Sequence, residues 1–132
     1  MNRIPGSIKN IQVSGRLSIV QVQAGEILLS AIVIDTPETA EWLRKDKDVE
    51  LVFKETEVII GVGVNHSVSL QNRIEGTISN IQESALLSKV MIETAVGTIC
   101  SVLSTSGVHF LKLMQGMHVT AMIKTNEIMI SP

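Results

Sequence analysis

The chain has 132 residues, of which 45% are hydrophobic but only 2% aromatic, and its formal net charge is −2. This charge gives no overall basic field for nucleic acid, and two Phe, one Trp and no Tyr provide no aromatic platform for stacking bases. One cysteine, Cys100, excludes an intrachain disulfide framework and fits a reducing compartment, and no apolar run is long enough to cross a bilayer. We therefore expect a cytoplasmic protein with no nucleic-acid or membrane partner.

In the first part of the chain, apolar periodicity predicts five strands, over residues 4–13, 16–24, 27–34, 48–53 and 57–62. The second strand alternates, with Ser18, Val20 and Val22 on one face, whereas the mostly apolar strand 27–34 is expected to be buried on both faces. Between the third and fourth strands, Thr36 as N-cap and Pro37 at the first position predict a short helix.

The second part of the chain repeats this plan. Strands are predicted over residues 73–82, 86–93, 97–103, 118–123 and 127–130. Ser104 to Gly107 lead into a short helix through Met114, which Gly116 is expected to end. Five short strands with one helix between the third and fourth are typical of a small OB-like barrel.

A tandem duplication explains the recurrence. Segments 2–20 and 72–90 share 12 of 19 residues at an offset of 70, and the register returns where 53–60 aligns with 123–130. We therefore predict an all-β protein of two tandem five-stranded OB-like β-barrels, each with one short helix, in units 1–63 and 67–132. Because a unit of this size buries too little surface to be stable alone, we expect the units to pack together and the chain to form a homo-oligomer, a dimer or trimer.

These repeated residues resemble a known family. Each unit opens with Asn-x-Ile-x-Gly-x-Ile-x-x-Ile, from Asn2 and from Asn72, and closes on a lysine followed four residues later by Val or Ile. This pattern resembles the Mop or TOBE domain of molybdate-binding proteins. Two such units in one chain resemble the tandem molbindins and the effector half of the molybdate-responsive transcription regulator. The resemblance implies intracellular storage, homeostasis or sensing of molybdate or tungstate, with oxyanion sites at subunit interfaces.

The resemblance also implies a set of ligand-binding residues. The family's opening Ser-Ala-Arg-Asn corresponds to Ser69, Leu70, Gln71 and Asn72, so a glutamine stands at the arginine position, and Met1 stands there in the first unit. The candidate oxyanion-binding residues are Lys124, Ser69, Gln71, Asn72, Ser104, Thr105 and Ser106 in the second unit, with Lys54, Thr36 and Asn2 in the first.

The chemistry of a tetrahedral dianion suits such a set, because it requires many hydrogen-bond donors and few acceptors. Ser104 to Ser106 precede a helix, where backbone amides and the helix dipole favour an anion, although such a run is also a common helix cap. A lysine at a strand end adds a point charge when it is a ligand, and is otherwise a solvated guard of the strand edge. Asp35 lies beside the first unit's loop, so we predict stronger binding in the second unit.

The residues do not indicate an enzyme. The three histidines share no metal-ligand spacing, Cys100 lies in an apolar strand, and there is no Ser-His-Asp set and no phosphate-cradling glycine loop. We therefore expect no directly bound metal ion and no catalytic residues. The alternative function is an oligomeric interaction or sensor module whose oxyanion binding is weak or lost, since Gln71 and Met1 replace the family's arginine.

Overall fold

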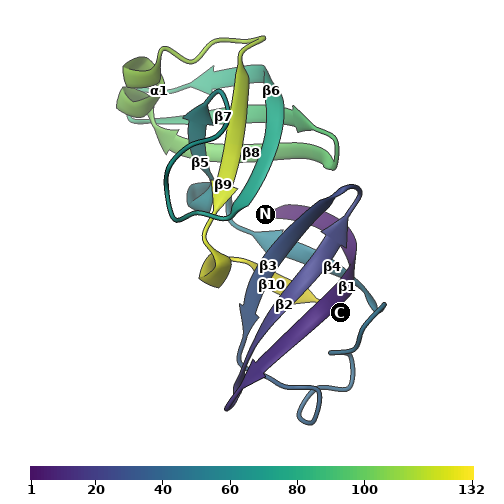
Figure 1. Cartoon of the computed structure of the whole chain (residues 1–132). Helices are drawn as coiled ribbons and strands as arrows, with labels where there is room; N and C mark the ends of the chain where they lie inside the picture. Colours follow the sequence, from purple (N-terminus) through teal and green to yellow (C-terminus); the bar gives the residue numbers. More distant parts are fainter.

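The protein is described here by a computed structural model that covers residues 1–132 (Figure 1). It is an all-β structure of ten strands and one helix, which confirms the all-β class and the predicted number of strands. The first five strands are β1 (Asn2–Ser14), β2 (Leu17–Ala24), β3 (Ile27–Val33), β4 (Asp48–Phe53) and β5 (Ile59–Val62). The remaining elements are β6 (Asn72–Glu83), β7 (Leu87–Thr94), β8 (Gly97–Ser104), α1 (Thr105–Leu111), β9 (His118–Ile123) and β10 (Met129–Ser131). Two 3₁₀ turns, η1 (Glu55–Glu57) and η2 (Thr125–Glu127), precede β5 and β10 respectively.

The strands form two five-stranded antiparallel sheets that exchange their edge strands. The first sheet has the order β10-β4-β1-β2-β3 and the second the order β5-β9-β6-β7-β8. Strand β5, expected to complete the first unit, pairs with β9, so that Ile59 lies opposite Met122. Strand β10 returns to the first sheet, where Met129 lies opposite Val52. In Figure 1, β5 accordingly lies among the strands of the second sheet and the yellow β10 among those of the first.

The exchange follows from the duplication. Because the two edge strands have matching apolar patterns, either one satisfies the open edge of either sheet, and the sequence pattern alone does not choose between them. The division of the chain into units 1–63 and 67–132 remains a prediction about the repeats. The strand pairing does not follow this division, because β5 belongs to the second sheet and β10 to the first. The crossing points are the turns η1 and η2, each followed by a buried residue, Val58 or Ile128.

Both repeats share a bulge in their long first strand. The pairing register shifts between Ile8 and Asn10 in β1 and between Ile78 and Asn80 in β6. In each repeat the freed carbonyl before the bulge accepts a hydrogen bond from a residue with positive φ, since Asp46 N–H donates to Ile8 at 2.7 Å and Gly116 N–H to Ile78 at 2.8 Å. The duplicated sequence therefore produces duplicated local geometry here.

The helix predicted at Thr36 is wrong. Residues 34–47 form turns without a helix, whereas the corresponding segment of the second repeat contains α1. The hydroxyl of Thr39 accepts a hydrogen bond from the Thr36 N–H and donates to the Asp35 carboxylate, at 2.8 and 3.0 Å. These bonds close a single turn at Thr36, but the chain does not continue it: the Leu43 N–H donates to the Ala40 carbonyl and the Arg44 N–H to the Trp42 carbonyl, and Ala40 and Leu43 are buried in the core. The predicted second helix is confirmed but ends earlier, because Lys112 adopts the left-handed conformation that closes it.

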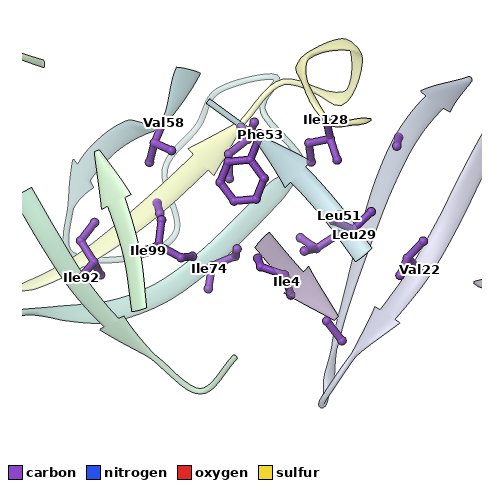
Figure 2. Close-up of a cluster of buried hydrophobic side chains, with 14 of the residues drawn as sticks. Ile4, Val22, Leu29, Leu51, Phe53, Val58, Ile74, Ile92, Ile99 and Ile128 are labelled. Carbon is purple, nitrogen blue, oxygen red and sulfur yellow. The ribbon is translucent and has the colours of Figure 1, made fainter. Parts of the chain in front are cut away.

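One hydrophobic core runs through both halves of the chain. Its 25 buried residues come from both sheets and include the fully buried Phe53, which Figure 2 shows together with Leu51, Ile74 and Ile128. Strand β3 is buried on one face only, because Leu29 and Ala31 are inside while Ile32 is 39% exposed, so the expectation of burial on both faces is wrong. The two repeats thus stabilise each other across a common core, and β3 retains an apolar outer face.

Candidate functional site

A polar pocket lies at the junction of the two repeats and collects three of the predicted ligand residues. Its volume is about 270 Å³, and its lining residues are Ile32, Ser69, Leu70, Gln71, Lys124, Thr125 and Asn126. Ser69 and Gln71 come from the segment before β6, Lys124 to Asn126 from the end of β9 and η2, and Ile32 from β3. At about 30 Å³ for each water, the volume corresponds to roughly nine waters, which is ample for an ion with four oxygens.

The turn η2 positions the lysine side of this pocket. Ile123 is fully buried before Lys124, and Ile128 is buried after the turn, so both ends of the segment are fixed by the core. The Glu127 N–H donates to the Lys124 carbonyl at 3.0 Å and closes the turn. The segment between these two anchors is therefore held outward, with Lys124 exposed.

The opposite wall is held by Arg73. Its Nε donates to the Leu70 carbonyl at 2.7 Å and its Nη2 to the Val68 carbonyl at 2.9 Å. The guanidinium therefore clamps the backbone on both sides of Ser69 and fixes the segment that presents Ser69 and Gln71. Sequence reasoning did not identify Arg73 in this role. Its counterpart in the first repeat, Arg3, donates instead to the exposed Glu50 carboxylate.

The pocket has the electrostatic character of an anion site. Lys124 is its one charged lining residue, and the other polar lining groups are the hydroxyls of Ser69 and Thr125 and the amides of Gln71 and Asn126. No ion pair of the structure involves Lys124, so its ammonium is not neutralised by a carboxylate. Sequence reasoning missed Thr125 and Asn126, although two polar residues directly after the predicted lysine are a usable signal.

The two predicted asparagines lie at the junction but have other partners. The Asn72 amide Nδ2 donates to the Ser30 carbonyl at 2.9 Å, and its Oδ1 accepts from the Ser30 N–H at 2.8 Å. Asn2 makes the same pair with the backbone of Cys100, with both distances at 2.8 Å. Each repeat thus bonds the third strand of the other, a reciprocal arrangement that an approximate two-fold axis produces. Neither side chain lines the pocket.

The hydroxyl-rich loop before α1 is also separate from the pocket. The Ser104 Oγ accepts a hydrogen bond from the Gly107 N–H at 3.0 Å and caps the helix. Thr105 is buried, and its hydroxyl bonds the Ser88 hydroxyl and the Ser84 carbonyl at 2.8 and 2.7 Å. Ser106 is exposed on the helix. The structure therefore places Ser104 and Thr105 in structural contacts of the helix start.

The corresponding position in the first half contains Lys54, Glu55 and Thr56. The Glu55 carboxylate forms an ion pair with the amino group of Met1. The hydrogen bond from this amino group, which is the main cause, together with its charge and that of Lys89, lowers the pKa of Glu55 below its usual value of 4.5. Thr36 lies apart from these residues in its own turn, where its hydroxyl accepts from the Glu38 N–H at 3.3 Å.

A larger hollow beside α1 has different chemistry. Its volume is about 590 Å³, and its lining residues are Ile81, Glu83, Val108, His109, Lys112, Leu113 and Met114. The Glu83 carboxylate accepts a hydrogen bond from His109 at 2.8 Å and gives this hollow an acidic group. A mostly apolar lining with a carboxylate is poorly suited to a dianion, so the smaller pocket is the better candidate despite its size.

The chain was compared with known proteins. The TOBE domain model matches residues 69–130. Molybdenum-pterin-binding protein 1 of Clostridium pasteurianum is 31% identical over 65 residues, which are 48% of this chain and 96% of that protein. The crystal structure of the cytoplasmic molybdate-binding protein ModG with molybdate bound is similar over 98% of this chain and 94% of that chain, with a TM-score of 0.90 and 22% identity. MopII from Clostridium pasteurianum matches 50% of this chain and all of its own, with a TM-score of 0.48 and 27% identity.

None of the helices in the structure has the length and apolar character needed to cross a membrane. No group of three or more His, Cys, Asp and Glu side chains converges as metal ligands. The polar pocket brings Ser69, Gln71 and Lys124 together, and it is the site on which a function is best argued.

Proposed function

The chain belongs to the TOBE-domain family, and we propose on that basis that it binds a tetrahedral oxyanion, molybdate or tungstate, in the pocket between Ser69 and Lys124. One observation carries the proposal: residues 69–71 and 124–126, far apart in the sequence, converge on one pocket that has a free ammonium and no carboxylate in its lining. The names of the relatives support it, since one is described as molybdenum-pterin-binding and the other as molybdate-binding.

Binding in this pocket uses hydrogen bonds rather than direct metal ligation. Lys124 supplies a positive charge, the hydroxyls of Ser69 and Thr125 donate to oxyanion oxygens, and Gln71 donates through its amide. A hydrogen bond to a charged group contributes about 1.5–3 kcal/mol, so Lys124 should account for a ten- to hundredfold share of the affinity. Gln71 also brings an acceptor oxygen, which must face away from the ligand.

The test compares two lysines at corresponding positions. Lys124→Ala should weaken molybdate binding by about ten- to hundredfold, whereas Lys54→Ala, its matched control, should leave it unchanged. Calorimetry with molybdate, tungstate and sulfate, together with metal analysis of the protein after gel filtration, measures affinity and stoichiometry. Failure of the parent protein to bind molybdate or tungstate would refute the proposal.

A gain of affinity provides a second test. Gln71→Arg introduces the cation that the family has at this position, and the planar guanidinium can bond two oxyanion oxygens at once. We expect tighter binding and a steeper loss of affinity with added salt. Gln71→Leu serves as the control that removes the amide without adding charge, and it should bind more weakly than the parent.

The chain is also proposed to form a homo-oligomer, a dimer or trimer. An apolar hollow of about 250 Å³ on the first repeat is lined by Val13, Leu17, Ile19 and Ile32 with two polar neighbours, and Ile32 also lines the oxyanion pocket. The second repeat has charged Glu83 and Lys89 in place of Val13 and Ile19. Exposed apolar residues grouped in this way indicate a contact surface. The role we propose for the oligomer is storage, homeostasis or sensing of the oxyanion in the cytoplasm, which the family resemblance implies. Light scattering at micromolar concentration tests this assembly.

The interaction-module alternative makes a different prediction. If the protein is an oligomeric module without oxyanion binding, Leu17→Asp should disrupt the assembly while no oxyanion binds to the parent at any concentration tested. In our proposal, each repeat is one OB-like TOBE unit, over 1–63 and 67–132, and the match at residues 69–130 lies within the second of them.

A further inference from the structure

The first repeat contains a counterpart of the turn that forms the lysine side of the oxyanion pocket. The turn η1 packs on β8 as η2 packs on β3, so Lys54, Glu55 and Thr56 correspond to Lys124, Thr125 and Asn126. A carboxylate therefore stands where the second repeat has a hydroxyl. The two repeats differ in charge at the point where a bound anion would be expected.

Two positive groups act on this carboxylate. Glu55 accepts a hydrogen bond from the Met1 amino group, and the charge of Lys89 on β7 further stabilises its ionised form. Lys54 begins the same turn, and its ammonium forms no ion pair. The counterpart of Lys89 in the first repeat is the apolar Ile19. The first-half turn thus presents a carboxylate together with the positive charges of Met1 and Lys89, whereas the Lys124 pocket has no carboxylate in its lining.

We propose that Glu55 is a built-in anion at the first-half counterpart of the pocket, and that it restricts oxyanion binding to the second half of the chain. A carboxylate fixed among cations satisfies the charges that a dianion would otherwise meet, and it repels the dianion directly. This inference rests on the proposed function, because it concerns the stoichiometry of the same ligand class. In this inference Glu55 takes the part that the sequence analysis gave to Asp35, whose carboxylate accepts a hydrogen bond from the Thr39 hydroxyl in its own turn.

The experiment replaces Glu55 of the first repeat by the residue that the second repeat has at the corresponding position. Glu55→Thr introduces the residue found at position 125, and it leaves Lys54 and Lys89 without the competing carboxylate. We expect the number of molybdate ions bound per chain to rise from one to two, with the new site weaker than the first because Met1 stands at the position of Gln71. Adding Lys54→Ala to Glu55→Thr should abolish the new site and return the number to one.

Matched controls separate this effect from a general change of charge. Glu57→Thr changes the net charge by the same amount in the same turn, and it should leave the parent stoichiometry at one. Glu55→Gln removes the charge with little change in shape, and it provides a second variant should the threonine disturb the turn. Circular dichroism and thermal melting confirm that each variant is folded before calorimetry is interpreted.

The outcomes distinguish this inference from the proposed function. One ion for the parent and two for Glu55→Thr support both, whereas one ion for parent, Glu55→Thr and Glu55→Gln alike overturns the role of Glu55 and leaves the Lys124 site intact. Two ions for the parent also overturn it. No binding to the parent but one ion to Glu55→Thr supports the inference and refutes the proposed function, and no binding to any of these proteins refutes both.

Discussion

The reciprocal asparagine bridges give the sharpest test of how the two repeats are held together. Asn72 is 1% exposed and makes two hydrogen bonds to the backbone of Ser30. Asn72→Ala removes both bonds, each with a net value of about 1 kcal/mol, and leaves a partly buried donor and acceptor of Ser30 without partners. We therefore expect the free energy of unfolding to fall by about 3 kcal/mol, a large share of a typical total of about 5–15 kcal/mol.

Urea denaturation at equilibrium, with ΔG extrapolated to water, measures this change. Asn2→Ala should cause a loss of similar size, because Asn2 makes the same two bonds to Cys100. Asn10→Ala is the matched control, since Asn10 is exposed and its one side-chain contact, to Gln21, is 3.5 Å long. A loss below about 0.5 kcal/mol for Asn72→Ala, with an unchanged m-value, would contradict the assignment of a structural bridge.

Three further changes have expected outcomes. Gly76→Ala would place a Cβ 2.5 Å from the Glu93 carbonyl oxygen, so the backbone must shift. Urea denaturation should show that the free energy of unfolding falls by about 1–3 kcal/mol, and parent-like stability would refute this close approach. Ending the chain after Ile128 removes β10 from the first sheet, so hydrogen exchange should quicken at the amides of β4 that bond β10 and not in β9; faster exchange in β9 instead would contradict the strand exchange. Because the pKa of Glu55 is lowered in the folded state, its ion pair should stabilise the parent relative to Glu55→Gln above pH 4.5 and lose this advantage as pH falls through the lowered pKa; a difference independent of pH would refute it.

Much of the local structure could be predicted from the sequence. All ten predicted strands are present, with ends within about two residues of those expected, because alternation of apolar and polar residues reports which face of a strand is buried. The helix at Ser104 was predicted because a hydroxyl cap precedes it, and the Ser104 side chain does cap it. The helix predicted at Thr36 is absent because tight-turn bonds follow Ala40 and Leu43 is buried in the core, contacts that residue preferences do not contain.

The candidate site likewise has some features that the sequence predicts and others that only the structure shows. Lys124, Ser69 and Gln71 were identified through the family pattern, and the structure brings them together. Asn72 is part of the same family pattern, but its side-chain amide bonds the backbone of the other repeat instead of lining the pocket. A motif records that a residue type recurs at a position, whereas only the packed structure decides which atoms it meets.

The sequence by itself determined the duplication, the strands and the apolar residues that form the core, because these depend on periodicity within one segment. The tertiary structure decided that β5 and β10 change places and that Asn2 and Asn72 bridge the repeats. Two repeats whose edge strands have matching apolar patterns offer each edge strand two equivalent partners. The choice between them depends on contacts between residues far apart in the chain, which local patterns do not encode.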